Sequence, residues 1–168
     1  MASPDASGLS GLLVPEDLVE FLESAVSIPF GTRDAQNRPA SMRAMGVSVP
    51  PDRESILAHL PEATAERTLA NLKDNGRVAV TFSRPSDYRS LQIKGRCVEV
   101  RPSTSEERTK QEIYLAGFVE ELAIVGMARE ASARLTYWPS VTVRVVIEAM
   151  FEQTPGPSAG KVLGRAAR

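Results

Sequence analysis

The chain has 168 residues, of which 42% are hydrophobic and 24% charged, and these values fit one globular domain with a single core. Its formal net charge of -1 gives it no general attraction for nucleic acid or an anionic membrane, and no segment has the roughly 20 apolar residues of a membrane-spanning helix. The single cysteine (Cys97) and single histidine (His59) exclude an internal disulfide and a metal site built from several His and Cys ligands, and the lone thiol fits a reducing cytoplasm.

The first third of the chain predicts a short helix followed by strands. Residues 1–13 are small, polar and rich in glycine and serine, so we expect a disordered lead rather than a signal peptide. Residues 15–25 carry apolar side chains at helical spacing, with acidic side chains on the other face. Residues 28–34 and 39–49 have the pattern of two strands joined by a turn, and residues 54–60 that of a further short strand.

The middle of the chain predicts a helix and two long strands. Residues 64–75 place apolar side chains on one helical face, and Gly76 is a common helix stop. Residues 77–83 alternate between apolar and smaller or polar side chains, which is typical of a half-buried strand. Residues 89–100 predict another strand, in which Gly95 is expected to mark a bulge.

The last third of the chain predicts helices and a final strand. Ser103 and Glu106 have the spacing of a capping box, so we expect a helix to begin there and to run to about residue 121. A second helical stretch is expected to reach about residue 134. Residues 141–151 are rich in valine and predict the last strand.

Roughly six strands interrupted by a few helices indicate an α+β fold with a mainly antiparallel, closed or half-closed sheet. A parallel nucleotide-binding fold would need a regular alternation of strands and helices, and the glycine-rich phosphate loops are absent from the sequence. We therefore predict one domain over residues 14–154, followed by a loop-like tail over residues 155–168.

Two basic elements are candidates for binding an anion. Arg43 lies between apolar positions of the second strand, where it either faces a ligand or extends into solvent from an edge strand. With Thr64 as the cap of the following helix, free backbone N–H groups and the helix dipole would create an anion site near Arg67 and Thr68. An ordinary exposed helix turn is the alternative.

A third candidate lies on the long strand over residues 89–100. Ser90, Gln92 and Lys94 are two residues apart, so they share one face of the sheet. Gln92 can both donate and accept hydrogen bonds, which suits the mixed edge of a flavin ring. Lys94 can stabilise negative charge on a reduced ring or a phosphate, and the alternative is a solvated strand face.

Taken together, these elements resemble the pyridoxamine 5′-phosphate oxidase superfamily. That family has Ser-Arg-Lys on a helix, then Asn-Asn-Pro-Arg-Val and a strand, then Arg-Gln and a glycine on the next strand. The matching segments here, in the same order, are residues 66–68, residues 74–78, Arg89-Ser90 and Gly95. Upstream, Arg38-Pro39 and Arg43 look like the family's turn and its phosphate-binding strand, with the register offset by one residue.

The resemblance, which covers about residues 15–101, implies a split β-barrel that binds FMN at the interface of a homodimer. It implies that Arg67 and Thr68 hold the phosphate beside Arg43, and that Ser90 and Gln92 face the isoalloxazine ring. The full set of implied cofactor-binding residues is Arg43, Met45, Arg67, Thr68, Ser90, Gln92 and Lys94.

The sequence also departs from the family's pattern. Thr68 stands where the family has a phosphate lysine, Ser90 stands where it has a glutamine, and the Arg-Leu-His signature of the true oxidases is absent. The resemblance therefore implies an FMN-dependent oxidoreductase that takes a small-molecule substrate or a nicotinamide donor but does not oxidise pyridoxamine phosphate. The alternatives are a non-catalytic flavin or heme module, with His59 as the axial ligand of heme, and a reductase that uses the deazaflavin F420.

Overall fold

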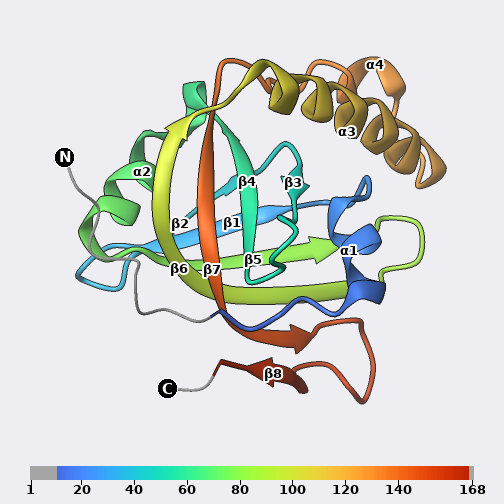
Figure 1. The fold of residues 1–168 in the computed structure, drawn as a ribbon. Helices are drawn as coiled ribbons and strands as arrows, with labels where there is room; N and C mark the ends of the chain where they lie inside the picture. Colours follow the sequence, from blue (N-terminus) through green and yellow to red (C-terminus); the bar gives the residue numbers. More distant parts are fainter. Residues whose placement is uncertain (1–10, 167–168) are drawn as a thin grey trace.

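A curled sheet organises residues 11–166, which are the residues that the computed structural model describes (Figure 1). The strands are β1 (Pro29–Arg33), β2 (Pro39–Arg43), β3 (Val47–Ser48), β4 (Ser55–Pro61), β5 (Arg77–Ser83), β6 (Ser90–Pro102), β7 (Ser140–Glu152) and β8 (Val162–Arg165). Their order in the sheet is β2-β1-β5-β6-β7-β4-β3, with β8 paired to β7, and the paired strands are antiparallel. The fold is a split β-barrel of the α+β class, so the predicted fold class is confirmed.

Each strand places alternate side chains in the core and on the outer face of the sheet. In β5, Val78, Val80 and Phe82 are buried, whereas Ala79 and Thr81 lie on the other face. Because directly opposed residues of antiparallel strands share a face, the same alternation continues across β1 and β6. The core face is covered, and the outer face of these strands stays partly open.

The helices cover the core face and one end of the barrel (Figure 1). They are α1 (Glu16–Glu23), α2 (Glu62–Asn75), α3 (Ser105–Ile124) and α4 (Arg129–Ser132). The buried side of α2 packs toward the core, where the Asn71 side-chain amide donates a hydrogen bond to the Thr32 hydroxyl over 3.0 Å. Among residues 11–166, no helix combines the length and the apolar character needed to cross a membrane.

The prediction of a single strand over residues 39–49 is wrong, because this segment forms two strands, β2 and β3, with a break between them. Gly46 lies in the break with a φ of 110°, a conformation that favours glycine. The Ala44 N–H donates to the carbonyl of Ile28, the residue before β1, whereas the Met45 N–H donates to the carbonyl of His59 in β4. The chain therefore passes from one edge of the sheet to the other within these residues, and this crossing closes the barrel.

The start of α2 also differs from the prediction. The helix begins at Glu62, so Thr64 lies inside the first turn and does not cap it. The Glu62 N–H donates to the Pro139 carbonyl over 2.9 Å. The first-turn N–H groups therefore precede Arg67 by about one turn, and an acidic side chain stands at this helix end.

The capping box of α3 lies one residue later than predicted. It uses Thr104 and Glu107 instead of Ser103 and Glu106. The Thr104 hydroxyl accepts from the Glu107 N–H over 3.2 Å, and the Glu107 carboxylate accepts from the Thr104 N–H over 2.8 Å. This shift turns Glu107 inward and places its carboxylate in a buried network.

The two ends of the chain complete the sheet. The tail predicted as a loop over residues 155–168 contains β8, which pairs with β7, and this part of the prediction is wrong. Most of the predicted lead over residues 1–13 lies outside the described residues. Within it, the Leu12 N–H donates to the Ile147 carbonyl over 2.8 Å.

Candidate functional site

Four of the predicted cofactor-binding residues lie on the outer face of the sheet. The register places Arg43 opposite Pro29, and it aligns residues of β5 with Ser90, Gln92 and Lys94 on β6. Because opposed residues share a face, the four side chains extend from the same side of the barrel wall. The structure therefore places Arg43, Ser90, Gln92 and Lys94 on one face of the sheet, as period-two spacing predicts for the three β6 residues.

Short polar contacts connect three of these side chains with Ser27, which lies just before β1, and with residues of β5. The Arg43 guanidinium donates to the Ser27 hydroxyl over 2.8 Å, and the Ser83 and Ser90 hydroxyls are 2.7 Å apart. The Gln92 amide donates to the Thr81 hydroxyl over 3.1 Å. We call this set the outer-face strip, and its members are Ser27, Arg43, Thr81, Ser83, Ser90, Gln92 and Lys94.

A row of small residues forms the floor beside the outer-face strip. Gly31, Ala79 and Ala149 lie at the same level as Lys94 on adjacent strands. A shallow groove of about 480 Å³ lies over part of this row, and Arg33 lines it together with Lys94. Within the described residues these two cations form no ion pair. A flat ring or a second protein surface can approach the sheet closely here, and an anionic group would be attracted to it.

The other three predicted residues lie elsewhere. Arg67 is exposed on α2, whereas Thr68 and Met45 are 2% and 1% exposed. The helix α2 packs on the core face through Asn71, whereas Lys94 and Gln92 extend from the outer face. One protomer does not bring all seven residues to one surface.

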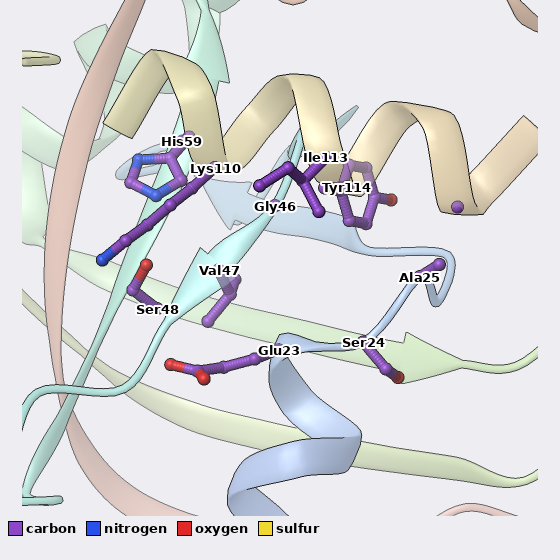
Figure 2. Close-up of a pocket in the computed structure, with 11 residues that line it drawn as sticks. Glu23, Ser24, Ala25, Gly46, Val47, Ser48, His59, Lys110, Ile113 and Tyr114 are labelled. Carbon is purple, nitrogen blue, oxygen red and sulfur yellow. The ribbon is translucent and has the colours of Figure 1, made fainter. Parts of the chain in front are cut away.

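A second cavity lies beneath α3, and we call it the α3 pocket (Figure 2). Its volume is about 390 Å³, and its walls come from α1, the β3 segment, β4 and α3. Figure 2 shows the side chains of Glu23, Ser48, His59 and Lys110 at one end of the pocket, with Tyr114 farther along α3. The sequence singled out only His59 among these residues.

A buried network holds the ring of His59. Its Nδ1 lies 3.1 Å from the Thr142 hydroxyl, and Thr142 donates to the Glu107 carboxylate over 3.0 Å. Arg101 donates to both oxygens of Glu107, over 2.8 and 2.7 Å. Burial raises the pKa of Glu107, but the hydrogen bonds from Arg101, Thr104 and Thr142 outweigh it and hold that pKa at about 2. Glu107 is therefore an acceptor throughout the neutral pH range.

This network fixes the tautomer of His59. Thr142 has one hydroxyl proton and gives it to the Glu107 carboxylate, so it accepts from His59 and His59 carries its proton on Nδ1. Desolvation lowers the pKa of His59 to about 4, which keeps the ring neutral. Nε2 then carries a lone pair, and within residues 11–166 this buried atom has no hydrogen-bond partner.

Arg43 connects the outer-face strip with the α3 pocket. Its guanidinium carbon lies 5.1 Å from the centre of the Phe118 ring, which stacks on Tyr114 with 5.6 Å between ring centres. Tyr114 lines the pocket and donates to the Val26 carbonyl over 2.7 Å. The two features are therefore neighbours, separated by one stacked aromatic pair.

Comparisons with known proteins agree with this architecture. A family model described as pyridoxamine 5′-phosphate oxidase matches residues 14–153. HupZ of Group A Streptococcus shares the fold at 16% identity and a TM-score of 0.54, with 88% of this chain and 100% of that chain covered. An F420 reductase gives 18% identity and a TM-score of 0.55, with 82% and 98% covered. No curated protein sequence matches this chain.

A structure from Lactobacillus delbrueckii, described as a candidate pyridoxamine 5′-phosphate oxidase, also shares the fold. Its identity is 14% and its TM-score 0.52, with 90% of this chain and 99% of that chain covered. At identities this low, the structural similarities establish the fold alone.

Proposed function

Because this chain belongs to the pyridoxamine 5′-phosphate oxidase family, we propose that it binds FMN at the interface of a homodimer and acts as an oxidoreductase. The observation that carries this proposal is the outer-face strip, where Arg43, Gln92 and Lys94 extend from one face of the sheet beside a floor of small residues. Bound FMN would supply hydride transfer, and the protein would supply binding, orientation and electrostatics.

The chemistry of the outer-face strip suits the flavin ring. Gln92 presents an amide that can donate to one ring atom and accept from another. Lys94 adds a positive charge that stabilises the anionic form of a reduced ring, and its ammonium lies 5.0 Å from the centre of the Phe151 ring. The floor formed by Gly31 and Ala79 allows a planar group to lie close to the backbone.

The position of Arg67 supports a site shared between two protomers. Arg67 is exposed on α2, a helix whose buried Asn71 meets Thr32 on the core face, whereas Gln92 and Lys94 extend from the outer face. If all of these residues serve one flavin, two copies of the chain must contribute to it. We propose that Arg43 and Arg67 bind the FMN phosphate, since a guanidinium pairs bidentately with phosphate oxygens.

Hydride transfer needs direct contact between donor and acceptor. We therefore expect the small-molecule substrate to approach the flavin on the open side of the outer-face strip and not from the α3 pocket, which lies beyond the stacked Phe118 and Tyr114 rings. A nicotinamide donor can reduce the flavin from the open side of the strip. We expect pyridoxamine phosphate not to be oxidised, because the family's phosphate lysine is Thr68 here and the Arg-Leu-His signature is absent.

The absorption spectrum of the purified protein tests this proposal directly. Flavin bands, together with a fluorescence titration in which FMN binds more tightly than riboflavin, would support it. A heme Soret band or a colourless protein that ignores added FMN would overturn it. Because an F420 reductase shares the fold, F420 is the second candidate cofactor, and tighter binding of F420 than of FMN would replace the proposal with that one.

A further inference from the structure

We propose that the α3 pocket binds a small ligand carrying a protonated amine, which donates a hydrogen bond to Nε2 of His59 and pairs with the carboxylate of Glu23. This inference goes beyond the proposed function and does not require a flavin. It rests on an orphaned buried acceptor, a pocket that this residue lines, and the balance of charge around it.

Nε2 of His59 is a buried acceptor without a partner in the described part of the chain, and a ligand in the pocket can supply the missing donor. A buried polar atom without a partner is costly, and native proteins rarely keep one unless a ligand or water completes it. The Nδ1 proton is committed to Thr142, so Nε2 on the other side of the ring can only accept. Its complement is therefore an N–H or O–H group of the ligand.

The charges at the pocket select an ammonium among these donors. Glu23 uses one carboxylate oxygen to accept from the Val49 N–H over 2.7 Å, and within residues 11–166 its other oxygen accepts no hydrogen bond, so it is available to a ligand. The Lys110 ammonium is 3.2 Å from Glu106, so it already has an anionic partner, and that partner does not line the pocket. Of the charged side chains that line the pocket within the described residues, Glu23 is therefore the one available to a ligand, which favours a cation over an anion.

The remaining walls of the pocket suit an apolar group on the amine. Val47, Ile113 and Tyr114 line the pocket beside the polar end (Figure 2). A volume of about 390 Å³ is within the range of small-molecule sites and exceeds what ammonium alone would fill. An arylalkyl or alkyl amine therefore matches both the charged and the apolar parts.

The single histidine of the chain allows a direct test. In protein labelled with ¹⁵N-histidine, Nε2 gives one pyridine-type resonance, and we would titrate the purified protein with benzylammonium, benzyl alcohol and benzoate. Benzylammonium should move this resonance saturably toward the pyrrole-type position, because its N–H donates to Nε2. Benzyl alcohol should bind more weakly and benzoate not at all.

Two variants make the test specific to the pocket. Glu23→Gln should weaken the binding of benzylammonium by about tenfold or more. The weak binding of benzyl alcohol should stay unchanged, because only the charge pair is lost. Glu20→Gln changes an exposed acid of the same helix outside the pocket lining and should leave both affinities unchanged.

The proposal is overturned if benzoate shifts Nε2 and benzylammonium does not, if no probe shifts it, or if the two variants weaken benzylammonium equally. None of these results alters the flavin titration, so this proposal and the proposed function can fail separately.

Discussion

His59 shows how a buried network can prepare one atom for a ligand. Its side chain is 1% exposed, and burial keeps the ring neutral because the charged form would lose its solvation. Glu107 raises the pKa of His59 through its charge, but desolvation and the charges of Lys110 and Arg101 outweigh it. The result is a neutral acceptor beneath α3 over the whole neutral pH range.

This environment predicts a loss of stability in mild acid. The pKa of His59 falls from 6.5 to about 4 on folding, so the unfolded chain binds a proton that the folded chain excludes. Stability is therefore fully present above pH 6.5 and falls as the pH drops toward 4. Between pH 7 and pH 5 the free energy of unfolding should decrease by about 2 kcal/mol, as measured by urea denaturation.

The control for this prediction is His59→Gln, which cannot titrate. Its stability should change little between pH 7 and pH 5, because the pKa of Glu107 is lowered and its contribution is lost mainly below 4.5. An equal decrease in His59→Gln would assign the pH dependence to other groups.

Arg43 and Arg67 should discriminate between FMN and riboflavin. A charge-assisted hydrogen bond is worth roughly 1.5–3 kcal/mol. Arg43→Ala and Arg67→Ala should therefore each weaken the binding of FMN by about 10- to 150-fold. Riboflavin lacks the phosphate, so its affinity should barely change. Gln92→Ala should weaken both ligands alike, because Gln92 would contact the ring.

Flavin fluorescence titrations with both ligands measure these effects. The matched control is Lys73→Ala, an exposed cation near the far end of α2. An equal loss of affinity for FMN and for riboflavin in Arg67→Ala would mean that this arginine does not bind the phosphate.

At the residue scale, the sequence predicts only those neighbours that one strand brings together. Ser90, Gln92 and Lys94 share a face because the side-chain period of a strand is two. The contact between His59 and Thr142 joins residues 83 positions apart, and no local pattern contains it. Only the register in which β4 pairs with β7 brings His59 and Thr142 together.

Among the elements, β6 depends on a bulge that the sequence marks with Gly95. The register shifts between Lys94 and Gly95, and the strand bends there as it passes between β5 and β7. A side chain at this glycine would clash with the Val146 carbonyl oxygen of the neighbouring strand. The bend therefore needs a residue without a Cβ atom.

Gly95→Ala should accordingly destabilise the protein by about 3 kcal/mol, at the upper end of ordinary overpacking costs. The control is Gly31→Ala in β1, whose added Cβ would lie 3.3 Å from the Ala79 carbonyl oxygen and needs only a small adjustment. Urea denaturation of the two variants compares them directly. If Gly95→Ala lowers the free energy of unfolding no more than Gly31→Ala does, then β6 can shift to accommodate the methyl group.

Element boundaries follow from the sequence where the local signal is strong. Residues 77–83 alternate without interruption, and β5 has those bounds. The break between β2 and β3 was missed because the apolar pattern continues through Gly46, and only the φ of that residue separates two strands that pair with different partners. The tail was missed because β8 gains its order from pairing with β7, which its own composition does not favour.

The whole molecule is expected to be a dimer in solution. The outer face of β1, β5 and β6 carries half-buried and exposed side chains beside small ones, and a second copy seated there would cover this face. Light scattering should therefore give about twice the chain mass of 18.2 kDa. A strict monomer at micromolar concentration would remove the shared-site proposal while leaving the fold unaffected.

A mixed dimer tests whether one flavin site uses both protomers. Arg67→Ala and Gln92→Ala each damage every site in their own homodimers, because each homodimer contains two copies of the defect. In a heterodimer of the two variants with shared sites, one site combines both defects, and the other combines the intact Arg67 of one protomer with the intact Gln92 of its partner. With unshared sites, every site of the heterodimer carries one defect.

Co-expression of the two variants should therefore restore tight FMN binding at about a quarter of all sites, since random pairing makes about half of the dimers mixed. The fluorescence titration should show this fraction as a tight phase with the wild-type Kd, absent when the two homodimers are mixed after separate purification without subunit exchange. A co-expressed sample that shows no tight phase would place Arg67 and Gln92 in the same protomer's site or in different sites.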